Sequence, residues 1–306
     1  MTDLPILHHY DTSPFSEKVR LLFGLKGLAW GSVQIPNMNP KPDYVPLTGG
    51  YRRTPSLQIG ADVFCDTQII LAEIERRWPD PRAVHGGLDW AINLWADRPF
   101  FSATVPIIFG LIGDSVPEAF IKDREQLSGR PFDTKAMKAA VEPMKGQWRG
   151  QAAWIEDQLA ASGTGWLNGD KVGLADIAAY MNIWFLGGAL PPVLAELTVG
   201  MPKLTDWAGR VRALGHGKPT AMTGAEALAI ARAATPAPGL KHDAADPLGL
   251  SPGDRVVVMA DDYGRDPVSG TLVAATPRSV TLSREDPAVG TVHVHFPRAG
   301  YFVVKG

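Results

Sequence analysis

Residues 10–20 read YDTSPFSEKVR, and the segments on either side mark this stretch as the junction between a strand and a helix. Upstream, PILHHY has the apolar and β-tolerant residues of a short strand. Downstream, four apolar residues recur at helical spacing, namely Phe15, Val19, Leu22 and Phe23. Ser13 can cap this helix while Pro14 takes its first position, where the missing N–H costs nothing. The free N–H groups of the first turn then favour an anion such as a thiolate, to which Ser13 could donate a hydrogen bond.

The pattern beyond this helix predicts a compact α/β domain. LAWGSVQIP at 28–36 predicts a second strand, and TPSLQIGADVFCD at 54–66 predicts two short strands that form an antiparallel hairpin. From Thr67 a helical pattern runs until a proline stops it. We therefore assign residues 1–80 to the first domain.

The rest of the chain separates into a helical part and a strand-rich part. Helical periodicity dominates residues 88–234, where GLADIAAYMNIWFL places Asp176 three residues after a possible N-cap at Gly173. An Ala- and Pro-rich linker follows at 235–250. Residues 251–306 alternate apolar and polar side chains in short strands, and a small SH3-like β-barrel is the simplest closure of such strands. The predicted fold class is α/β plus all-α, with a small all-β appendage.

Composition excludes several classes of partner. The 306 residues suffice for two or three domains, and a formal net charge of −2 gives no electrostatic footprint for nucleic acid or an anionic membrane. The N-terminus has no secretory pattern, and the strongest apolar stretch, VPIIFGLIG at 105–113, is too short to span a bilayer. Cys65 is the only cysteine, so the chain has no internal disulfide. We expect a cytoplasmic protein without nucleic-acid or membrane partners.

Three motifs, in their order and spacing, resemble those of the cytosolic glutathione transferases. They are TSPFSEKVRLLFGLKGL, RRTP and DTQIILAEIE, and the likeness covers roughly residues 4–232. The resemblance implies a thioredoxin-like first domain, an all-helical second domain, a homodimer, and glutathione as co-substrate. The Ser13 segment looks like that of the tau class, where the catalytic residue is serine, and of the omega class, where it is cysteine. Serine here implies transfer of the glutathione thiolate to a small apolar electrophile, with Thr12 and Ser16 as rival donors.

The donor role of Ser13 is also physically sufficient. A thiol with a pKa near 8.5 is mostly protonated at neutral pH, although only the thiolate attacks an electrophile. One hydrogen bond to an ionised group contributes roughly 1.5 to 3 kcal/mol, which corresponds to about one to two pKa units. Ser13 would thus stabilise the nucleophile without being one.

The resemblance assigns two roles in the RRTP segment. Pro55 is cis in the family, and the residue before it, here Thr54, pairs its backbone with the cysteinyl part of glutathione. Arg53 falls where a lysine often binds the glycyl carboxylate, and a guanidinium can do so with two hydrogen bonds. Arg52 is the alternative, and either arginine could be a solvated charge.

Asp66 and Thr67 match the acidic residue and serine that hold the γ-glutamyl group in the family. The hydroxyl and the first-turn N–H groups suit a carboxylate, while the aspartate suits an ammonium. An ordinary capping pair is compatible with the same residues.

The electrophile pocket is the least defined part of the site. In the family, the first long helix of the second domain faces the sulfur, and four aromatic residues here are candidates: Trp95, Phe100, Phe101 and Phe109. We predict no metal site, because His293 and His295 share a strand face without an evident third ligand. A solvated strand face explains these histidines better, and an inert core thiol explains Cys65.

Two other functions remain open. The chain could be a non-enzymatic scaffold that keeps the fold and uses the C-terminal strands for interactions. A glutathione-dependent thiol reductase is the other alternative, but Ser13 and Ser16 stand where that chemistry needs a cysteine. The sequence leaves three roles for residues 251–306: covering the active site, docking a partner, or extending a dimer.

Overall fold

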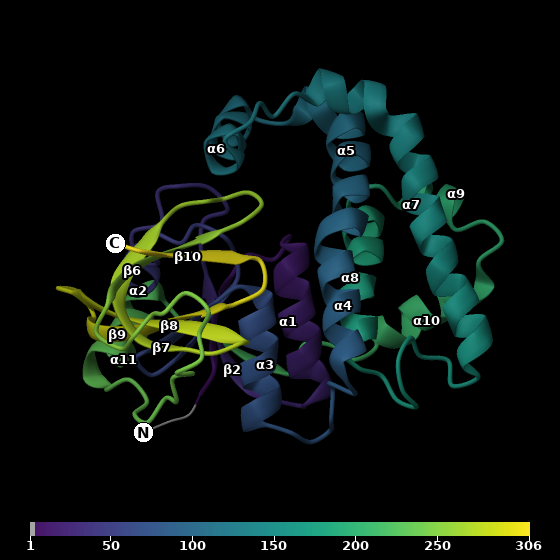
Figure 1. Ribbon diagram of the computed structural model, residues 1–306. Helices are drawn as coiled ribbons and strands as arrows, with labels where there is room; N and C mark the ends of the chain where they lie inside the picture. Colours follow the sequence, from purple (N-terminus) through teal and green to yellow (C-terminus); the bar gives the residue numbers. More distant parts are fainter. Residues whose placement is uncertain (1–3) are drawn as a thin grey trace.

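One ten-stranded mixed sheet runs through the computed structural model, which describes residues 4–306 (Figure 1). Its strands are β1 (Ile6–His9), β2 (Ala29–Gln34), β3 (Ser56–Ile59), β4 (Asp62–Cys65), β5 (Lys218–Ala221), β6 (Arg255–Ala260), β7 (Val268–Ala275), β8 (Ser279–Asp286), β9 (Gly290–Pro297) and β10 (Tyr301–Lys305). Across the sheet they follow the order β10-β6-β7-β8-β9-β4-β3-β1-β2-β5.

The first domain is the thioredoxin-like unit that the sequence predicts. β1 pairs with β2 in parallel and with β3 antiparallel, and β3 and β4 form the predicted hairpin. The helices of this domain are α1 (Pro14–Leu25), α2 (Val45–Thr48) and α3 (Thr67–Arg77). α1 begins as expected, because the Ser13 side chain accepts from the Ser16 N–H at 3.1 Å and Pro14 takes the first position.

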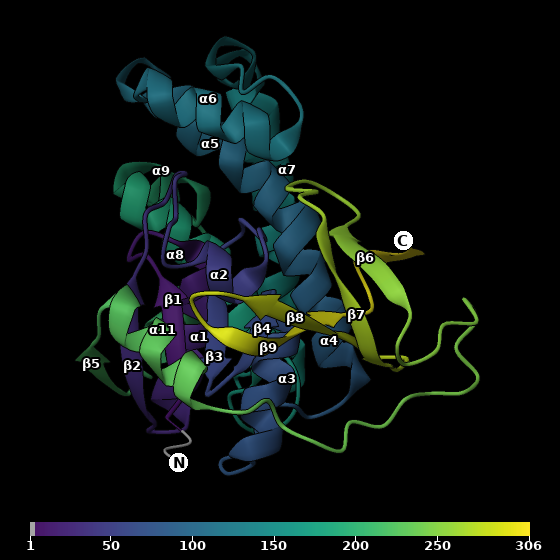
Figure 2. The same cartoon turned by 90° about the vertical axis from the view of Figure 1, so that its left-hand side faces the viewer.

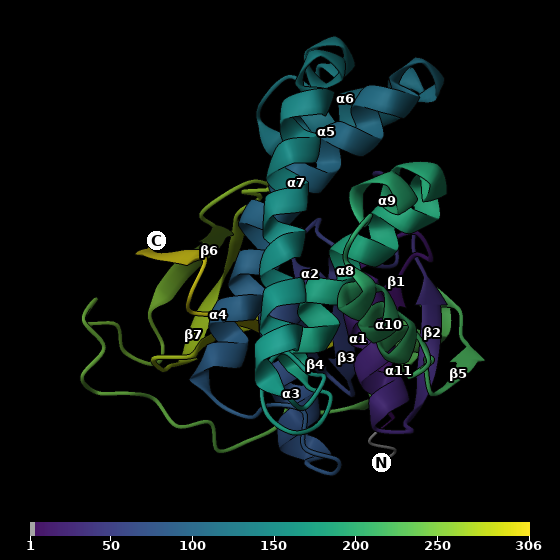
Figure 3. The ribbon, with the colours of Figure 1, turned by 90° about the vertical axis from the view of Figure 1, so that its right-hand side faces the viewer.

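Helices form the second domain, on the right of Figure 1. They are α4 (Gly87–Trp95), the π-helical turn η1 (Ala96–Phe100), α5 (Phe101–Ile112), the 3-10 turn η2 (Gly113–Ser115), α6 (Glu118–Ser128), α7 (Thr134–Ser162), α8 (Leu174–Ala189), α9 (Pro191–Leu197) and α10 (Pro202–Arg212). α8 contacts both α1 and α4, so it joins the two domains. The long helix α7 runs along the outer side of this bundle (Figure 3). No helix among residues 4–306 is both long and apolar enough to cross a membrane.

Residues 218–233 return to the first domain, although the sequence predicts them as the end of the helical domain. β5 pairs in parallel with β2 at the edge of the sheet. The following helix α11 (Gly224–Ala233) contacts β2 and α2, and the Gln58 side chain donates to the Ala227 carbonyl at 2.8 Å. The four residues of β5 are all exposed, so no hydrophobic alternation marks this strand in the sequence.

The C-terminal extension, residues 251–306, continues the same sheet. Its strands form an antiparallel set ordered β10-β6-β7-β8-β9, and β9 pairs in parallel with β4. The SH3-like barrel is not confirmed, because the strand order runs from β10 to β5 without returning on itself. β4 offers a free edge, and pairing with that edge satisfies β9 without closing a barrel. The linker at 235–250 runs along the outside of the molecule without regular structure (Figure 2).

The two histidines of β9 lie at the seam between β4 and β9. His295 is buried, and its ring nitrogens contact Asp62 Oδ1 at 2.7 Å and Thr281 Oγ1 at 2.9 Å. His293 lies 3.9 Å from the same carboxylate. The solvated face expected for these histidines is therefore wrong for His295, whose ring is buried and stacks on the Phe64 ring at 4.3 Å between centroids.

Candidate functional site

A cavity of about 790 Å³ lies where the two domains and the C-terminal extension meet. Residues around the start of α1 and the loop before β3 line one side, and α5, α6 and the segment between α6 and α7 line the other. The β6–β7 loop, residues 261–267, contributes the remaining wall. The structure therefore places three sequence-distant segments around one space of ligand size.

Aromatic side chains make the apolar wall of this cavity. Phe101 and Phe109, two of the four pocket candidates named from the sequence, line it. Trp95 and Phe100 do not belong to the lining residues, because they stack on each other at 5.1 Å and Phe100 is fully buried against Trp148. Other apolar lining residues are Val105, Pro106, Phe120, Phe132, Met137 and Phe185.

α6 closes the cavity from above by resting on the first domain. Asp123 pairs with Arg52 at 2.7 Å and accepts from the Asn39 N–H at 3.0 Å. Arg124 donates to the Asn37 carbonyl at 3.0 Å. Figure 1 shows α6 standing apart from the helical bundle, above the first domain. Arg52 is thus a structural partner of α6 rather than a solvated charge.

The start of α1 presents Thr12, rather than Ser13, to the cavity. Thr12 is exposed and lines the space, whereas Ser13 is 1% exposed and its Oγ accepts from the Ser16 N–H. Ser16 is fully buried, and its Oγ is without a hydrogen-bond partner. Tyr10 also lines the cavity; burial raises the pKa of its hydroxyl, an effect that Arg124 and a hydrogen bond with Ser13 partly oppose. Sequence reasoning missed Tyr10, whose only signal is its place directly after the β1 segment.

Lys41 is a second residue that sequence reasoning missed. It is buried, lines the cavity, and donates to Thr54 Oγ1 at 3.1 Å and to the Arg52 carbonyl at 3.0 Å. Burial, followed by the charge of Arg124, lowers the pKa of its ammonium to about 8; Asp123 partly opposes this shift, and Arg52 adds to it. Within residues 4–306 no carboxylate lies at ion-pair distance from Lys41. Its signal in the sequence is a lysine between two prolines, NPKPD, in a segment that reads as an irregular loop.

The Thr54–Pro55 peptide bond is cis, in the geometry expected from the resemblance. Thr54 lines the cavity, so the main chain before β3 borders the same space as Thr12 and Lys41.

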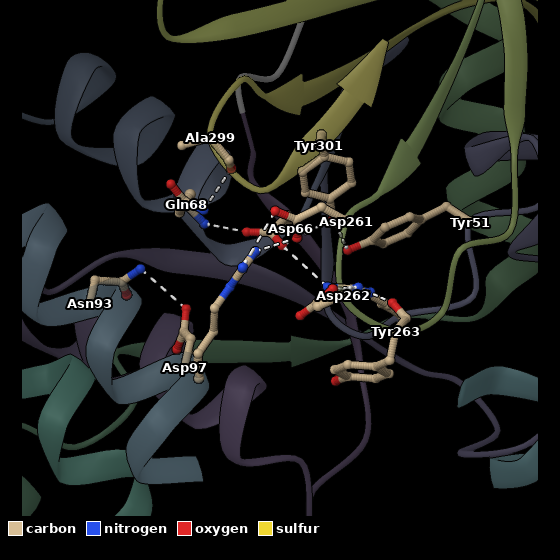
Figure 4. A network of polar contacts seen from close by, with 12 residues as sticks. Tyr51, Asp66, Gln68, Asn93, Asp97, Asp261, Asp262, Tyr263, Ala299 and Tyr301 are labelled. Atoms are coloured by element: carbon tan, nitrogen blue, oxygen red, sulfur yellow. Dashed lines mark hydrogen bonds and ion pairs between the residues drawn. The ribbon is translucent and has the colours of Figure 1, made fainter. Parts of the chain in front are cut away.

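Arg53 points into the C-terminal extension. Its guanidinium pairs with the Asp262 carboxylate and donates to the Tyr263 carbonyl. The same group stacks 4.4 Å from the Tyr263 ring and lies 5.9 Å from the Tyr301 ring. Figure 4 shows Asp262 and Tyr301 near Asp66, whose Oδ2 lies 4.0 Å from Arg53 Nη1. Arg53 is therefore engaged within the protein rather than free for a glycyl carboxylate.

Asp66 caps α3 and also contacts the extension. Oδ1 accepts from the Gln68 N–H at 2.9 Å, and Oδ2 accepts from the Tyr301 hydroxyl at 3.0 Å. Its φ of 90° is rare for a residue with a side chain. Thr67 is the buried first residue of α3. Cys65, directly before Asp66, is a buried free thiol whose pKa is raised by burial. Among the described residues, no cluster of three or more potential ligands could hold a metal ion.

Comparisons with known proteins place the chain in a family. A sequence model described as the glutathione S-transferase N-terminal domain matches residues 7–82, and one described as a domain of unknown function matches residues 102–218. A GST-like protein of known structure from Pseudomonas syringae is 37% identical over 100% of both chains, with a TM-score of 0.82. The chain therefore belongs to the glutathione S-transferase family.

More distant structures share the fold alone. A glutathione S-transferase from Rhodospirillum rubrum is 20% identical, covers 69% of this chain and 88% of its own, and gives a TM-score of 0.54. A glutathione S-transferase from Methylobacterium radiotolerans, solved with glutathione sulfonate, is 21% identical over 72% and 97% of the two chains, with a TM-score of 0.51. A search of curated proteins finds no match for this chain.

Proposed function

We propose that this protein is a glutathione transferase that adds the glutathione thiolate to a small apolar electrophile. The observation that carries the proposal is the cavity of about 790 Å³, where the start of α1, the main chain at Thr54 and the aromatic wall of α5 meet. The first provides donors for a thiolate, the second provides backbone groups for a cysteinyl unit, and the third suits an apolar partner.

The thiolate is held at the N-terminus of α1. In the first turn Pro14 has no N–H and the Ser16 N–H donates to Ser13 Oγ, so the Phe15 N–H and the helix dipole are what favour a negative charge there. Thr12 is the better placed hydroxyl donor, because it lines the cavity while Ser13 is buried in the cap of α1. In this arrangement Ser13 acts by fixing the helix start, and Thr12 donates to the sulfur.

Lys41 takes the glycyl carboxylate in this proposal. It supplies a cavity-lining ammonium beside Thr54, whereas Arg53 is already paired with Asp262. A buried ammonium without a carboxylate partner gains most from an anionic ligand, because burial penalises its charge until a counter-charge arrives.

The apolar electrophile then approaches from α5. Phe101 and Phe109 form its wall, and Phe109 packs on Phe120 and Phe132 with ring centroids 5.7 and 5.1 Å away. Attack by the sulfur forms the carbon–sulfur bond while the electrophile's leaving group departs with the bonding electron pair. The donors at α1 hold the nucleophile as a thiolate until that step.

The test compares Thr12→Val with Ser13→Ala by calorimetry with glutathione and by thiolate absorbance against pH. We expect the wild type to lower the pKa of the bound thiol by about one to two units, as one charge-assisted hydrogen bond allows. Thr12→Val should lose most of this shift and the conjugation of 1-chloro-2,4-dinitrobenzene. Ser13→Ala should retain the shift and lose about 1 kcal/mol of stability through the lost cap.

Two outcomes would contradict the proposal. A shift that disappears in Ser13→Ala but persists in Thr12→Val would return the donor role to Ser13. No glutathione binding at millimolar concentration would remove the transferase function and favour a scaffold that only keeps the fold.

A further inference from the structure

We propose that the C-terminal extension competes with the γ-glutamyl end of glutathione for its binding subsite. Asp262 and Tyr301 make the contacts with Arg53 and Asp66 that this end of the ligand would otherwise make. The inference rests on the proposed function, because it names how the same site treats one part of its thiol ligand. It concerns the subsite at the start of α3, next to the large cavity.

The charges of this subsite match an α-amino acid. A free amino acid end presents a carboxylate and an ammonium close together, which complement a guanidinium and a carboxylate. Arg53 and Asp66 form such a pair, with 4.0 Å between Nη1 and Oδ2. Their ligand-facing partners, however, come from the protein itself.

The extension supplies a substitute for the carboxylate of the amino acid end and another for its ammonium. Asp262 gives Arg53 a carboxylate, in the place of the ligand's carboxylate. The Tyr301 hydroxyl donates to Asp66 at 3.0 Å, in the place of the ligand's ammonium. Because Asp66 Oδ1 already accepts from the Gln68 N–H, both oxygens of this carboxylate are in use. Figure 4 shows Asp262 and Tyr301 of the extension near Asp66.

The volume of the subsite also leaves no room for the γ-glutamyl end. The cavity left between Arg53, Asp66, Gln68 and Tyr301 measures about 30 Å³. That volume holds about one or two water molecules and is too small for the end of an amino acid. The neighbouring cavity of about 790 Å³ retains room for the cysteinyl and glycyl parts and for an electrophile.

Three helical elements, η1, α6 and α3, hold the β6–β7 loop and the turn before β10 in place. Arg98 of η1 pairs with Asp261 at 2.5 Å, and the Leu127 carbonyl of α6 accepts from the Gly264 N–H at 2.7 Å. Gln68 of α3 donates to the Ala299 carbonyl at 3.2 Å. These contacts hold the β6–β7 loop and the turn before β10, while the strands of the extension stay paired elsewhere. Asp262 thus lies in the loop between two strands, whereas Tyr301 is the first residue of β10 and pairs with Ala260 of β6.

The expected consequence is that the γ-glutamyl group adds little affinity in the wild type. Glutathione and cysteinylglycine, which lacks that group, should bind with similar dissociation constants. Removing Asp262 takes away the closer of the two carboxylates that pair with Arg53 and leaves Asp66 at 4.0 Å, so the ligand's own carboxylate can take the place of Asp262. Glutathione alone should gain from this change.

The experiment is calorimetric titration of both thiols into the full-length wild type, Asp262→Ala, Tyr301→Phe and the double variant. Asp254→Ala is the matched control, because Asp254 pairs with Lys305 at 3.1 Å within the same extension and away from the cavity. We expect the preference for glutathione over cysteinylglycine to be less than threefold in the wild type and the control. It should rise at least tenfold in the double variant, with cysteinylglycine affinity unchanged, and thermal unfolding should show that each variant is folded.

The outcomes separate this inference from the proposed function. A wild type that already prefers glutathione by more than tenfold, or a double variant with unchanged preference, would overturn the inference alone. Failure of both thiols to bind any form would overturn the thiol site itself, and the inference with it. Tyr301→Phe supplies an independent arm, because it deletes one hydroxyl and leaves Arg53 paired with Asp262.

Discussion

Lys41 should make anion binding in the large cavity depend on pH in a range where other side chains change little. Its pKa is lowered to about 8 by burial and by the nearby guanidinium groups of Arg124 and Arg52. The ammonium is therefore about nine-tenths charged at pH 7 and about one-tenth charged at pH 9. If the ligand carboxylate binds only the charged form, affinity should fall about tenfold between these two pH values.

The perturbation that isolates this effect is Lys41→Arg, because a guanidinium stays charged throughout this range. S-methylglutathione is the ligand, since its blocked sulfur removes the titration of the thiol. Calorimetry at pH 7, 8 and 9 gives the affinity ratio of wild type to variant, in which titrations of the ligand cancel. We expect this ratio to fall about tenfold, and a constant ratio would refute the role of Lys41.

The same group links pH to stability with a definite sign. An unfolded lysine titrates near 10.5, so the lowered pKa in the folded protein means that burying the charge costs stability below pH 8. As the pH rises from about 8 towards 10.5, the unfolded state binds more protons than the folded state, and this cost is relieved. Lys41→Met should therefore flatten the pH dependence of the unfolding free energy above pH 8, as urea titrations can measure.

Two further predictions concern the core. Asp176 accepts hydrogen bonds from the N–H groups of Gly173 and Leu167 and from the Trp207 indole. Asp176→Ala should therefore lower the free energy of unfolding in urea by about 3 to 5 kcal/mol, because it leaves three buried donors unpaired. A loss below about 1 kcal/mol would contradict this expectation. Cys65 should react with a thiol reagent at least a hundredfold more slowly in the native protein than in urea, because it is fully buried with a raised pKa, and equal rates would show that the β4 edge opens readily.

The sequence predicts the thioredoxin-like unit well because its signals are local. Ser13 and Pro14 mark the start of α1, and a capped helix forms wherever the capping residue and the apolar spacing agree. The pairings that organise the rest of the sheet are long-range. β5 joins β2, and β9 joins β4, across most of the chain, and no local pattern specifies which free edge a strand selects.

The same difference between local signals and long-range contacts explains which site residues could be predicted from the sequence. Thr54 and Pro55 precede β3 with the expected cis bond, and Asp66 caps α3, so the position of each follows from the end of a regular element. Lys41 is in an irregular loop, and its ammonium is held by the Arg52 carbonyl and the Thr54 hydroxyl, more than ten positions further along the chain. The engagement of Arg53 depends on Asp262, a residue 209 positions away, and could not follow from either segment alone.

The β4–β9 pairing can form only late in synthesis, because β9 is made long after β4. Asp62 and His295, which contact each other across this seam, are 233 positions apart. At a synthesis rate of about 5–20 residues per second, β9 leaves the ribosome roughly 10 to 50 s after β4. Throughout that interval the first domain carries an open strand edge, which is a template for pairing with other nascent chains. β9, which is made late, thus covers the edge of β4, and a chain that stalls before β9 would be released with this edge uncovered.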